Sequence, residues 1–414
     1  MNKKFLMFGI PILAIGLVFG AVLIYYGQVN QTVNVQQAVT LEGNPSVTYS
    51  NVYSPDVIVD GTHSLKNHDP TNSRGVSLAT TYSPDGNGIT TTYYSDSVNS
   101  IVSTSNRLVE LQNSSWDWIV TGASSPSGTV YLNIAGVTAQ GLLTAYKSTG
   151  NVSYLTASEK TGDYLLTQYG NQSLDPSLTA LTGSKHINAY NVKFLYDLGS
   201  VSGNTLYTNE ANLLMEKVIT TYPTASDLVS ADTTARAGVG VGIVAWDLFN
   251  YIENAKSYGN PTWANDLATS IQGISVPNTD QTYIVGLAGL VMSGSSSAVQ
   301  ELMNNQSSDG SWTDANGNVQ DTAYSVMALK FAGEYKSALK GQLWLTSKNS
   351  NGVFLESDNN EYSEVDSEAI QSIPMKLVTS VNLSPNSELS LYIENNFNTS
   401  GNGTYTITTT ANPQ

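Results

Sequence analysis

Apolar helical segments that begin after a short polar stretch recur along this chain at a spacing of roughly 40 to 50 residues, a period typical of repeat architectures. The starts read Thr138-Ala139, His186-Ile187-Asn188-Ala189-Tyr190, Asp232-Thr233-Thr234-Ala235, Asp280-Gln281-Thr282-Tyr283, Asp321-Thr322-Ala323-Tyr324 and Asp366-Ser367-Glu368-Ala369. The helices between these starts have a narrow apolar stripe, as outer helices do, whereas those at the starts are apolar over a wider face. The repeats therefore predict a mainly α fold, an (α/α)6 toroid over residues 97–400.

The segment before the fifth start has a recognisable pattern. Asp309-Gly310 is a turn signal, and Gln306, Gly310 and Trp312 have the spacing Q-x-x-x-G-x-W. This segment resembles the QW repeat of the terpenoid cyclase and protein prenyltransferase superfamily, which includes the squalene/hopene cyclases and whose fold is an α/α toroid. Gln112…Trp116 and Lys348…Phe354 resemble degraded copies. The resemblance implies a structural task, in which the indole packs over a neighbouring helix end and the amide binds free backbone groups.

The N-terminal residues 1–27 predict a membrane anchor. Lys3-Lys4 precede an uncharged apolar run from Phe5 to Tyr26, and about twenty such residues cross a bilayer as a helix. No A-x-A cleavage pattern follows, so a signal anchor is favoured over a removed signal peptide. The lysines hold the N-terminus inside. The prediction is a single-pass cell-membrane protein with most of the chain extracellular, or a secreted one if the segment is cleaved, and several N-x-S/T triplets agree with a glycoprotein.

Residues 28–95 show the alternation of strands, separated by turn signals such as Asn44-Pro45 and Asp60-Gly61. They predict a small β-sandwich stalk. The stretch Gly61–Asn67 resembles β domains found just outside the anchor in many archaeal surface proteins. Residues 401–414 are interpreted as a polar tail.

Several functions are excluded by composition and by motifs. Seventeen basic and 33 acidic residues give a net charge of −16, which argues against a nucleic-acid partner. Cysteine is absent, so the zinc site of protein prenyltransferases and the thioester of complement-like toroids cannot be built. Glu364-Val365-Asp366-Ser367 lacks the final aspartate pair of the cyclase D-x-D-D motif. Gly238-Val239-Gly240-Val241-Gly242 is interpreted as close helix packing rather than a nucleotide loop. No cofactor and no metal are predicted.

Inner helices of a toroid direct their N-termini toward one mouth, so the residues that open them should converge there. The predicted catalytic residues are Asp232, Arg236, Asp280, Asp321 and Asp366, and the predicted substrate-binding residues are His186, Tyr190, Trp246, Tyr283, Tyr324, Glu364 and Glu368. Clustered carboxylates shift each other's pKa values, so that one can act as an acid while another stays ionised. For any single aspartate, however, an N-cap worth about 1 kcal/mol is the commoner role. Arg236 and the Glu364-Asp366-Glu368 group exceed what capping requires.

Carboxylates beside aromatic rings suit a sugar polymer, since glycosidic bonds are broken by an acid and a base. The leading hypothesis is a membrane-anchored extracellular toroid that recognises a polysaccharide or glycoprotein glycan and cleaves it as a hydrolase or lyase. The competing hypothesis is a non-catalytic cell-envelope protein for adhesion or assembly. A terpenoid-cyclase-like enzyme is the more distant alternative.

Overall fold

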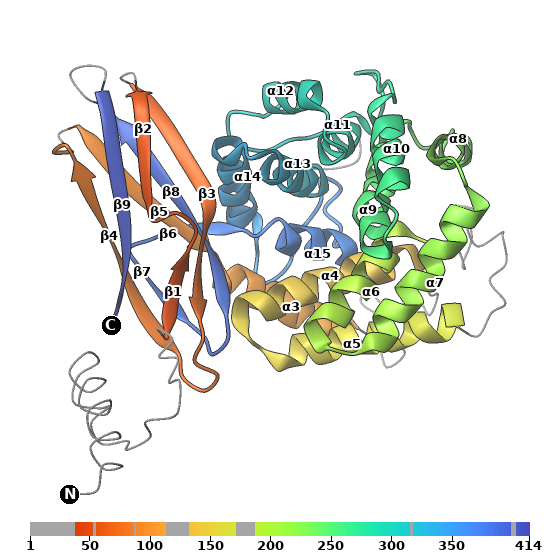
Figure 1. The fold of residues 1–414 in the computed structure, drawn as a ribbon, viewed down its shortest axis with the longest axis horizontal. Helices are drawn as coiled ribbons and strands as arrows, with labels where there is room; N and C mark the ends of the chain where they lie inside the picture. The colour runs from red at the N-terminus through yellow and green to blue at the C-terminus, as the bar shows by residue number, and fades with distance from the viewer. Residues whose placement is uncertain are drawn as a thin grey trace, which may run out of the picture. The chain divides into compact units, whose positions relative to one another are not determined.

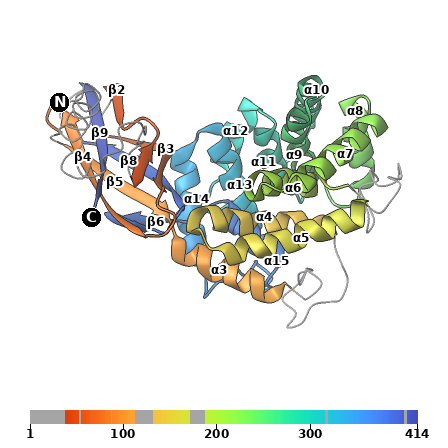
Figure 2. The same cartoon turned by 60° about the horizontal axis from the view of Figure 1, so that its bottom comes forward.

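Helices of the inner and outer layers alternate around a closed ring (Figures 1 and 2). The computed structural model describes residues 38–52, 55–86, 88–112, 132–170, 187–314, 318–398 and 403–414. In this part of the chain the inner helices are α4 (Leu132–Thr149), α6 (Ala189–Ser202), α9 (Gly242–Tyr258), α11 (Tyr283–Met292), α13 (Asn318–Ala332) and α15 (Ser363–Gln371). Each inner helix packs against the next, and α15 packs against α4. This contact closes the ring, as the repeat spacing predicts.

The outer layer consists of the helices that connect these inner ones. They are α3 (Val98–Leu111), α5 (Val152–Gly170), α7 (Thr205–Thr221), α10 (Pro261–Gln272), α12 (Ser296–Asn304) and α14 (Tyr335–Lys348), with α8 (Ala225–Ala235) packed on α10. Their sequences explain the two layers. In α11 every residue from Tyr283 to Val291 is buried, whereas α12 buries only Ala298 and Leu302. A helix that is apolar all round needs neighbours on all sides, and an amphipathic one needs them on one side.

The QW segment performs the structural task that its resemblance implies. Trp312 is fully buried, and its Nε1 donates to the Leu302 carbonyl at the end of α12, at 2.7 Å. The Gln306 amide donates to the carbonyls of Gly310 at 3.0 Å and Ser337 at 2.9 Å. A helix end, a turn and the next outer helix are thereby tied together. At the degraded copies, Gln112 donates to the Ala157 carbonyl, and Phe354 is fully buried.

Two of the predicted helix starts are wrong. Thr138-Ala139 lies inside α4, which begins at Leu132. Asp232-Thr233 lies at the end of α8, and the third inner helix begins only at Gly242, after a glycine-rich loop. This loop does serve close packing: a Cβ on Gly242 would lie 1.9 Å from the Thr282 carbonyl oxygen. No side chain fits there, so α9 and α11 can approach each other at this point.

A β-sandwich is built from both ends of the described chain. Its strands are β1 (Val39–Glu42), β2 (Ser46–Val52), β3 (Asp56–Asn67), β4 (Arg74–Ser83), β5 (Ile89–Asp96), β6 (Met375–Val378), β7 (Ser380–Leu383), β8 (Glu388–Phe397) and β9 (Gly403–Pro413). One sheet has five strands in the order β1-β3-β8-β5-β6, and the other has four in the order β2-β9-β4-β7. The strand pairings among the described residues are antiparallel, with β8 between β3 and β5 and β9 between β2 and β4.

The sandwich corrects the predicted domain boundaries. Residues 375–398 were expected to close the toroid and residues 401–414 to form a polar tail, but both segments hold strands that complete the sheets. The physical reason is that β3 and β5 each leave an unpaired edge that the N-terminal half alone does not cover. Strand β8 covers both edges and buries alternate residues such as Leu389, Leu391 and Ile393.

The sandwich packs on the ring through α14 and through a buried polar contact. Leu339 of α14, Met375 of β6 and Tyr392 of β8 form one apolar cluster. Nearby, the Asp96 carboxylate at the end of β5 accepts from the Ser390 amide at 3.0 Å and from the Ser148 hydroxyl of α4 at 3.2 Å. Burial raises the pKa of Asp96 to about 6 and lowers that of Lys330, on α13, to about 8. The positive Lys330 partly offsets the cost of burying Asp96.

The predicted membrane anchor lies outside the described residues. Within the part of the chain that is described, none of the helices combines the length and the apolar character that a bilayer span requires.

Candidate functional site in the ring lumen

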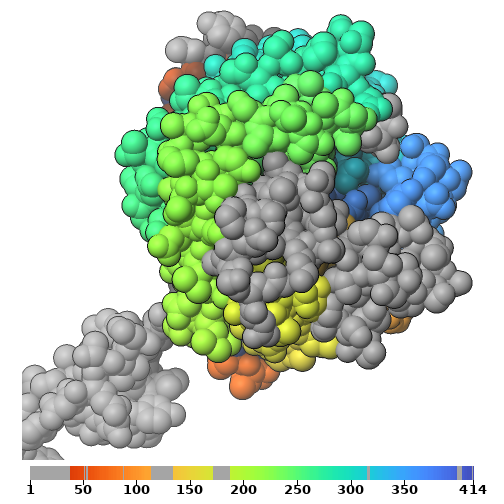
Figure 3. All heavy atoms as spheres, turned by 90° about the vertical axis from the view of Figure 1, so that its right-hand side faces the viewer, coloured from red at the N-terminus to blue at the C-terminus, as the bar shows by residue number. Residues whose placement is uncertain are grey.

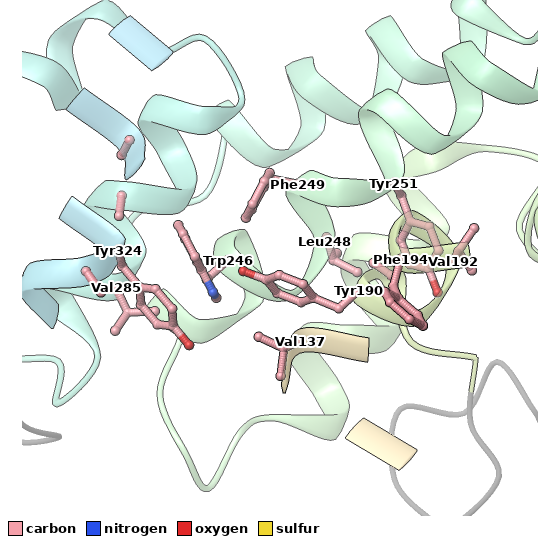
Figure 4. Close-up of a cluster of buried hydrophobic side chains, with 14 of the residues drawn as sticks. Val137, Tyr190, Val192, Phe194, Trp246, Leu248, Phe249, Tyr251, Val285 and Tyr324 are labelled. Carbon is pink, nitrogen blue, oxygen red and sulfur yellow. The ribbon is translucent and has the colours of Figure 1, made fainter. Parts of the chain in front are cut away.

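Four aromatic side chains from three inner helices meet inside the ring, and we call them the aromatic cluster: Tyr190 of α6, Trp246 and Phe249 of α9, and Tyr324 of α13 (Figure 4). The Trp246 ring stacks on Tyr324 with centroids 3.9 Å apart and lies 4.7 Å from Phe249. Its centroid is 6.5 Å from that of Tyr190. In Figure 4 the indole nitrogen of Trp246 and the Tyr190 hydroxyl lie beside each other. The cluster is mostly apolar, but its polar ends gather on one side.

Glu368 on α15 binds this cluster through the neighbouring inner helix α13. The Tyr324 hydroxyl donates to Glu368 Oε1 at 2.5 Å, and the Gln320 amide donates to Glu368 Oε2 at 3.0 Å. Glu368 is 2% exposed, and burial, followed by the negative charge of Glu364, raises its pKa well above the usual value for a glutamate. The hydrogen bonds from Tyr324 and Gln320 oppose this shift, and they fix the Glu368 carboxyl group against the polar edge of the cluster.

A second group of ionisable side chains lies one helical turn earlier on α15 and across the ring on α9. Glu364 precedes Glu368 by four residues, so the two side chains share a face of α15. Burial raises the pKa of Glu364 to about 7, and the negative charge of Asp247 adds to the shift. Burial likewise raises the pKa of Asp247 to about 6, against the opposing effect of Arg236. In the ring order α4, α6, α9, α11, α13, α15, these two carboxyl groups come from opposite helices.

Arg236 connects two of the carboxyl groups. Its Nη2 lies 2.6 Å from Asp247 Oδ2, and its Nε lies 3.6 Å from Asp232 Oδ1. The Arg236 and Asp247 side chains are 24% and 21% exposed, whereas Asp232 is fully buried. Burial raises the pKa of Asp232 to about 7, Asp247 raises it further, and Arg236 opposes the shift. One guanidinium therefore serves two carboxyl groups that release their protons near neutral pH, which is a property of many catalytic sites.

Several predicted site residues are brought together here. Tyr190, Trp246, Tyr324 and Glu368 form or bind the aromatic cluster, and Glu364 and Arg236 flank it. The predicted Asp232–Arg236 ion pair is present, although its segment ends α8 rather than opening an inner helix. Figure 3 shows the ring face that is turned away from the sandwich, with the outer helices curving round it.

Three predicted catalytic aspartates instead bind backbone amides. Asp280 accepts from the amides of Val241 and Thr282, both at 2.8 Å. Asp321 accepts from the Asp314 amide at 2.7 Å, and Asp366 accepts from the Phe354 amide at 2.8 Å. Asp321 and Asp366 are fully buried. The three hold the loops that precede α9, α13 and α15. None of them is the N-cap of its helix: Asp321 and Asp366 lie inside α13 and α15, and Thr282 and Tyr362 are the N-cap residues of α11 and α15.

Two further predicted residues do not join the cluster. The Tyr283 hydroxyl donates to Glu301 of the outer helix α12, so it contacts the outer layer. His186 lies outside the described residues. In the described ranges no three His, Asp or Glu side chains are grouped so as to hold a metal ion.

Sequence reasoning missed Asp247, the partner of Arg236 and Glu364. A signal for it was present: Asp247 is the one charged residue in the run Gly242–Asn250, which is otherwise almost wholly apolar and belongs to an inner helix. Apolar neighbours cannot form hydrogen bonds with a buried carboxylate or balance its charge. A charged residue in such a helix therefore indicates a polar partner or a ligand. Gln320, which precedes the fifth start by one residue, was missed as well.

Comparisons with known proteins identify no family. No family model and no curated protein matches this chain. Among solved structures, the chain is similar to the GH76A alpha-1,6-mannanase from Salegentibacter sp. HEL1_6, with 10% identity, 67% of this chain and 98% of that chain covered, and a TM-score of 0.43. An unsaturated glucuronyl hydrolase specific for heparin gives 12% identity, coverages of 67% and 94%, and a TM-score of 0.45. At these identities and scores, the similarity assigns no activity to this chain.

Proposed function

We propose that this protein binds a glycan in the ring lumen and hydrolyses its glycosidic bond, with Glu364 as general acid and Asp247 as general base. The observation that carries the proposal is the pair itself. The two carboxyl groups come from opposite inner helices, lie within electrostatic reach of each other, and have pKa values of about 7 and about 6. Glycosidases use two carboxyl groups on either side of the scissile bond, of which one is protonated and one ionised near the working pH.

The reaction requires one proton transfer at each group. Glu364 would donate its proton to the glycosidic oxygen, which leaves as a hydroxyl group as the bond to the anomeric carbon breaks. A water molecule would add to that carbon and lose a proton to Asp247. Arg236, at 2.6 Å from Asp247, favours its ionised form and so keeps the base ready.

The aromatic cluster supplies polar atoms for sugar hydroxyls. Trp246 Nε1 and, beside the cluster on α9, Asn250 Nδ2 are buried next to the Tyr190 hydroxyl, but neither meets a partner in full hydrogen-bond geometry. A buried donor without a partner costs about 1–3 kcal/mol, so such groups are rare in native proteins and call for a ligand or water. A sugar hydroxyl would satisfy both donors, which a hydrocarbon substrate would not.

One observation favours the non-catalytic alternative, a glycan-binding or envelope protein for adhesion. Trp246 is 1% exposed and stacks on Tyr324, so its ring face is already occupied by protein. A sugar could therefore contact the polar edge of the aromatic cluster but could not stack on the Trp246 ring. The two functions differ in whether product forms, not in where the glycan binds.

The test uses the purified full-length protein and a panel of oligosaccharides, with chromatography to detect released reducing ends. Glu364→Gln and Asp247→Asn should abolish release. Glu253→Gln is the matched control, because Glu253 lies on the same helix as Asp247 with a side chain that is 62% exposed. Release that survives both lumen variants would refute the proposed roles. Binding without release in the parent protein would favour the adhesion function.

We also propose that the chain is anchored in the cell membrane through Phe5–Tyr26, with the ring and sandwich outside. The support is the length and lack of charge of this run, together with Lys3-Lys4 before it. Protease treatment of intact cells should degrade the protein, and alkaline washing of membranes should leave it in the pellet. Full protection from the protease would contradict the proposed orientation.

A further inference from the structure

A separate shallow hollow, open to solvent over most of its extent, lies on the outer helix α14, beside the QW turn. Its volume is about 510 Å³, and its lining includes Ser308, Asp309, Lys340, Trp344, Ser347 and Lys348. Ligand pockets in proteins usually have volumes of about 300–1,000 Å³, so the hollow is large enough for a small molecule or one end of a polymer. None of these residues belongs to the lumen site. We call this feature the outer hollow.

A stripe of three side chains forms one wall of the outer hollow. Lys340, Trp344 and Lys348 follow one another at intervals of four residues and therefore lie on one side of α14. Lys348 Nζ lies 4.9 Å from the centroid of the Trp344 ring, a cation–π contact. The Trp344 Nε1 donates to Asp309 Oδ2 at 3.1 Å. The indole is held by its edge, and a flexible lysine covers its face.

The charge of the outer hollow differs from that of the protein. Among the described residues, the salt bridges of Lys66, Lys193 and Lys256 do not involve Lys340 or Lys348. Lys348 faces the Trp344 ring and its charge helps to lower the pKa of Asp309. Asp309 is the one carboxylate in the lining, and it already accepts from the Ser311 amide and hydroxyl and from Trp344. The lining thus has two positive charges and one committed negative charge, on a chain with a net charge of −16.

We propose that the outer hollow is a secondary glycan site that binds a sugar unit with a carboxylate or sulfate group. The two ammonium groups would hold the anion by charge-assisted hydrogen bonds. As Lys348 moves to the anion, the face of Trp344 opens to the apolar face of the sugar ring. The Ser308 hydroxyl in the lining would bind a sugar hydroxyl, and the Ser347 hydroxyl, which donates to the Trp344 carbonyl at 2.6 Å, would only accept from one. This site lies on the outer layer of helices and does not depend on the chemistry of the lumen.

The experiment is isothermal titration calorimetry of the full-length protein with four probes: trigalacturonate, a sulfated disaccharide, uncharged maltotriose and a hexaglutamate peptide. Binding of trigalacturonate or of the sulfated sugar, but not of the other two, is expected, and the pair distinguishes carboxylate from sulfate. Lys340→Gln and Lys348→Gln should each weaken binding by about tenfold, since each removes one charge-assisted contact. Lys336→Gln should leave it unchanged, because Lys336 is an exposed lysine on the same helix that does not line the hollow.

Four outcomes would overturn the proposal. These are the absence of binding by both anionic sugars, full binding in both lining variants, an equal loss in Lys336→Gln, or equally tight binding of hexaglutamate. The third would indicate general attraction to positive charge, and the fourth an acidic peptide site. Loss of anionic sugar binding in Glu364→Gln, with the lining variants unaffected, would place the ligand in the lumen instead.

Discussion

The contribution of the QW segment to stability can be calculated from its hydrogen bonds. In Trp312→Phe the ring is largely kept, but the Nε1 bond to the Leu302 carbonyl is lost. This carbonyl still accepts from the Asn305 amide at 3.2 Å, so one hydrogen bond disappears and no orphan acceptor is left. The expected loss is about 1 kcal/mol for the bond, plus about 1 kcal/mol for the smaller volume in a fully buried position. Trp312→Ala should lose roughly 3–5 kcal/mol.

Gln306→Met tests the amide in the same segment. It removes two donations, to the carbonyls of Gly310 and Ser337, while keeping the length of the side chain. At about 1 kcal/mol each, the expected loss is about 2 kcal/mol. Gln300→Met is the matched control, because the Gln300 amide bonds only to the exposed Asn304 on the same helix and its removal should change stability by less than about 0.5 kcal/mol.

Urea unfolding followed by far-UV circular dichroism measures these differences from the shift of the midpoint. If Trp312→Phe and Gln306→Met both unfold at the midpoint of Gln300→Met, the segment does not hold the ring together, and the structural interpretation of the QW repeat fails. Equal slopes in all variants would show that the extent of unfolding is the same.

Three further predictions follow from buried groups. The folded-state pKa of Glu364 is raised from 4.5 to about 7, so the stability that its protonated form contributes is fully present below pH 4.5 and is lost as the pH rises through 7. The unfolding free energy of the parent protein should fall by about 3 kcal/mol more than that of Glu364→Gln over this pH range. An identical pH dependence of the two proteins would refute this. Lys330→Met removes the positive charge that opposes the rise in the pKa of buried Asp96, so it should raise that pKa further and lower the unfolding free energy at neutral pH, with partial recovery on adding Asp96→Asn; no recovery in the double variant would show that the two groups are not coupled. Gly242→Ala should lower the thermal midpoint because its Cβ would meet a backbone oxygen at 1.9 Å, at a cost of about 1–3 kcal/mol, whereas Gly203→Ala, with open space around its Cβ but φ at 73°, should lose only about 1 kcal/mol.

The helical ring could be predicted from the sequence because the patterns that indicate it each lie within one short segment. An inner helix such as α11 is apolar on every side over one continuous segment, and the QW spacing lies within seven residues from Gln306 to Trp312. The start of α9 was misplaced because Asp232-Thr233-Thr234 has the composition of a helix cap, although its aspartate is fully buried at a helix end. Composition identifies the residues that can cap, but only packing shows which backbone amides they meet.

The sandwich and the site could be predicted only in part, since both depend on distant pairings. Strand β8 pairs with β3 and β5, which precede it in the sequence by some three hundred residues. No local sequence pattern indicates a pairing over such a separation. In the lumen, Glu364, Glu368 and Arg236 were found because they exceed what capping needs. Asp247 was missed because its significance comes from its partners on α15 and in the loop after α8.

The position of β8 between β3 and β5 also bears on how this chain is made. Ile89 pairs with Phe397, so the strands synthesised first wait for about 300 residues of ring before their partners leave the ribosome. At a synthesis rate of about 5–20 residues per second, that interval is roughly 15–60 seconds. During this time the edges of β3 and β5 are open to any other nascent strand, so a chaperone that shields them, or faster synthesis that shortens the exposure, would raise the yield of folded protein.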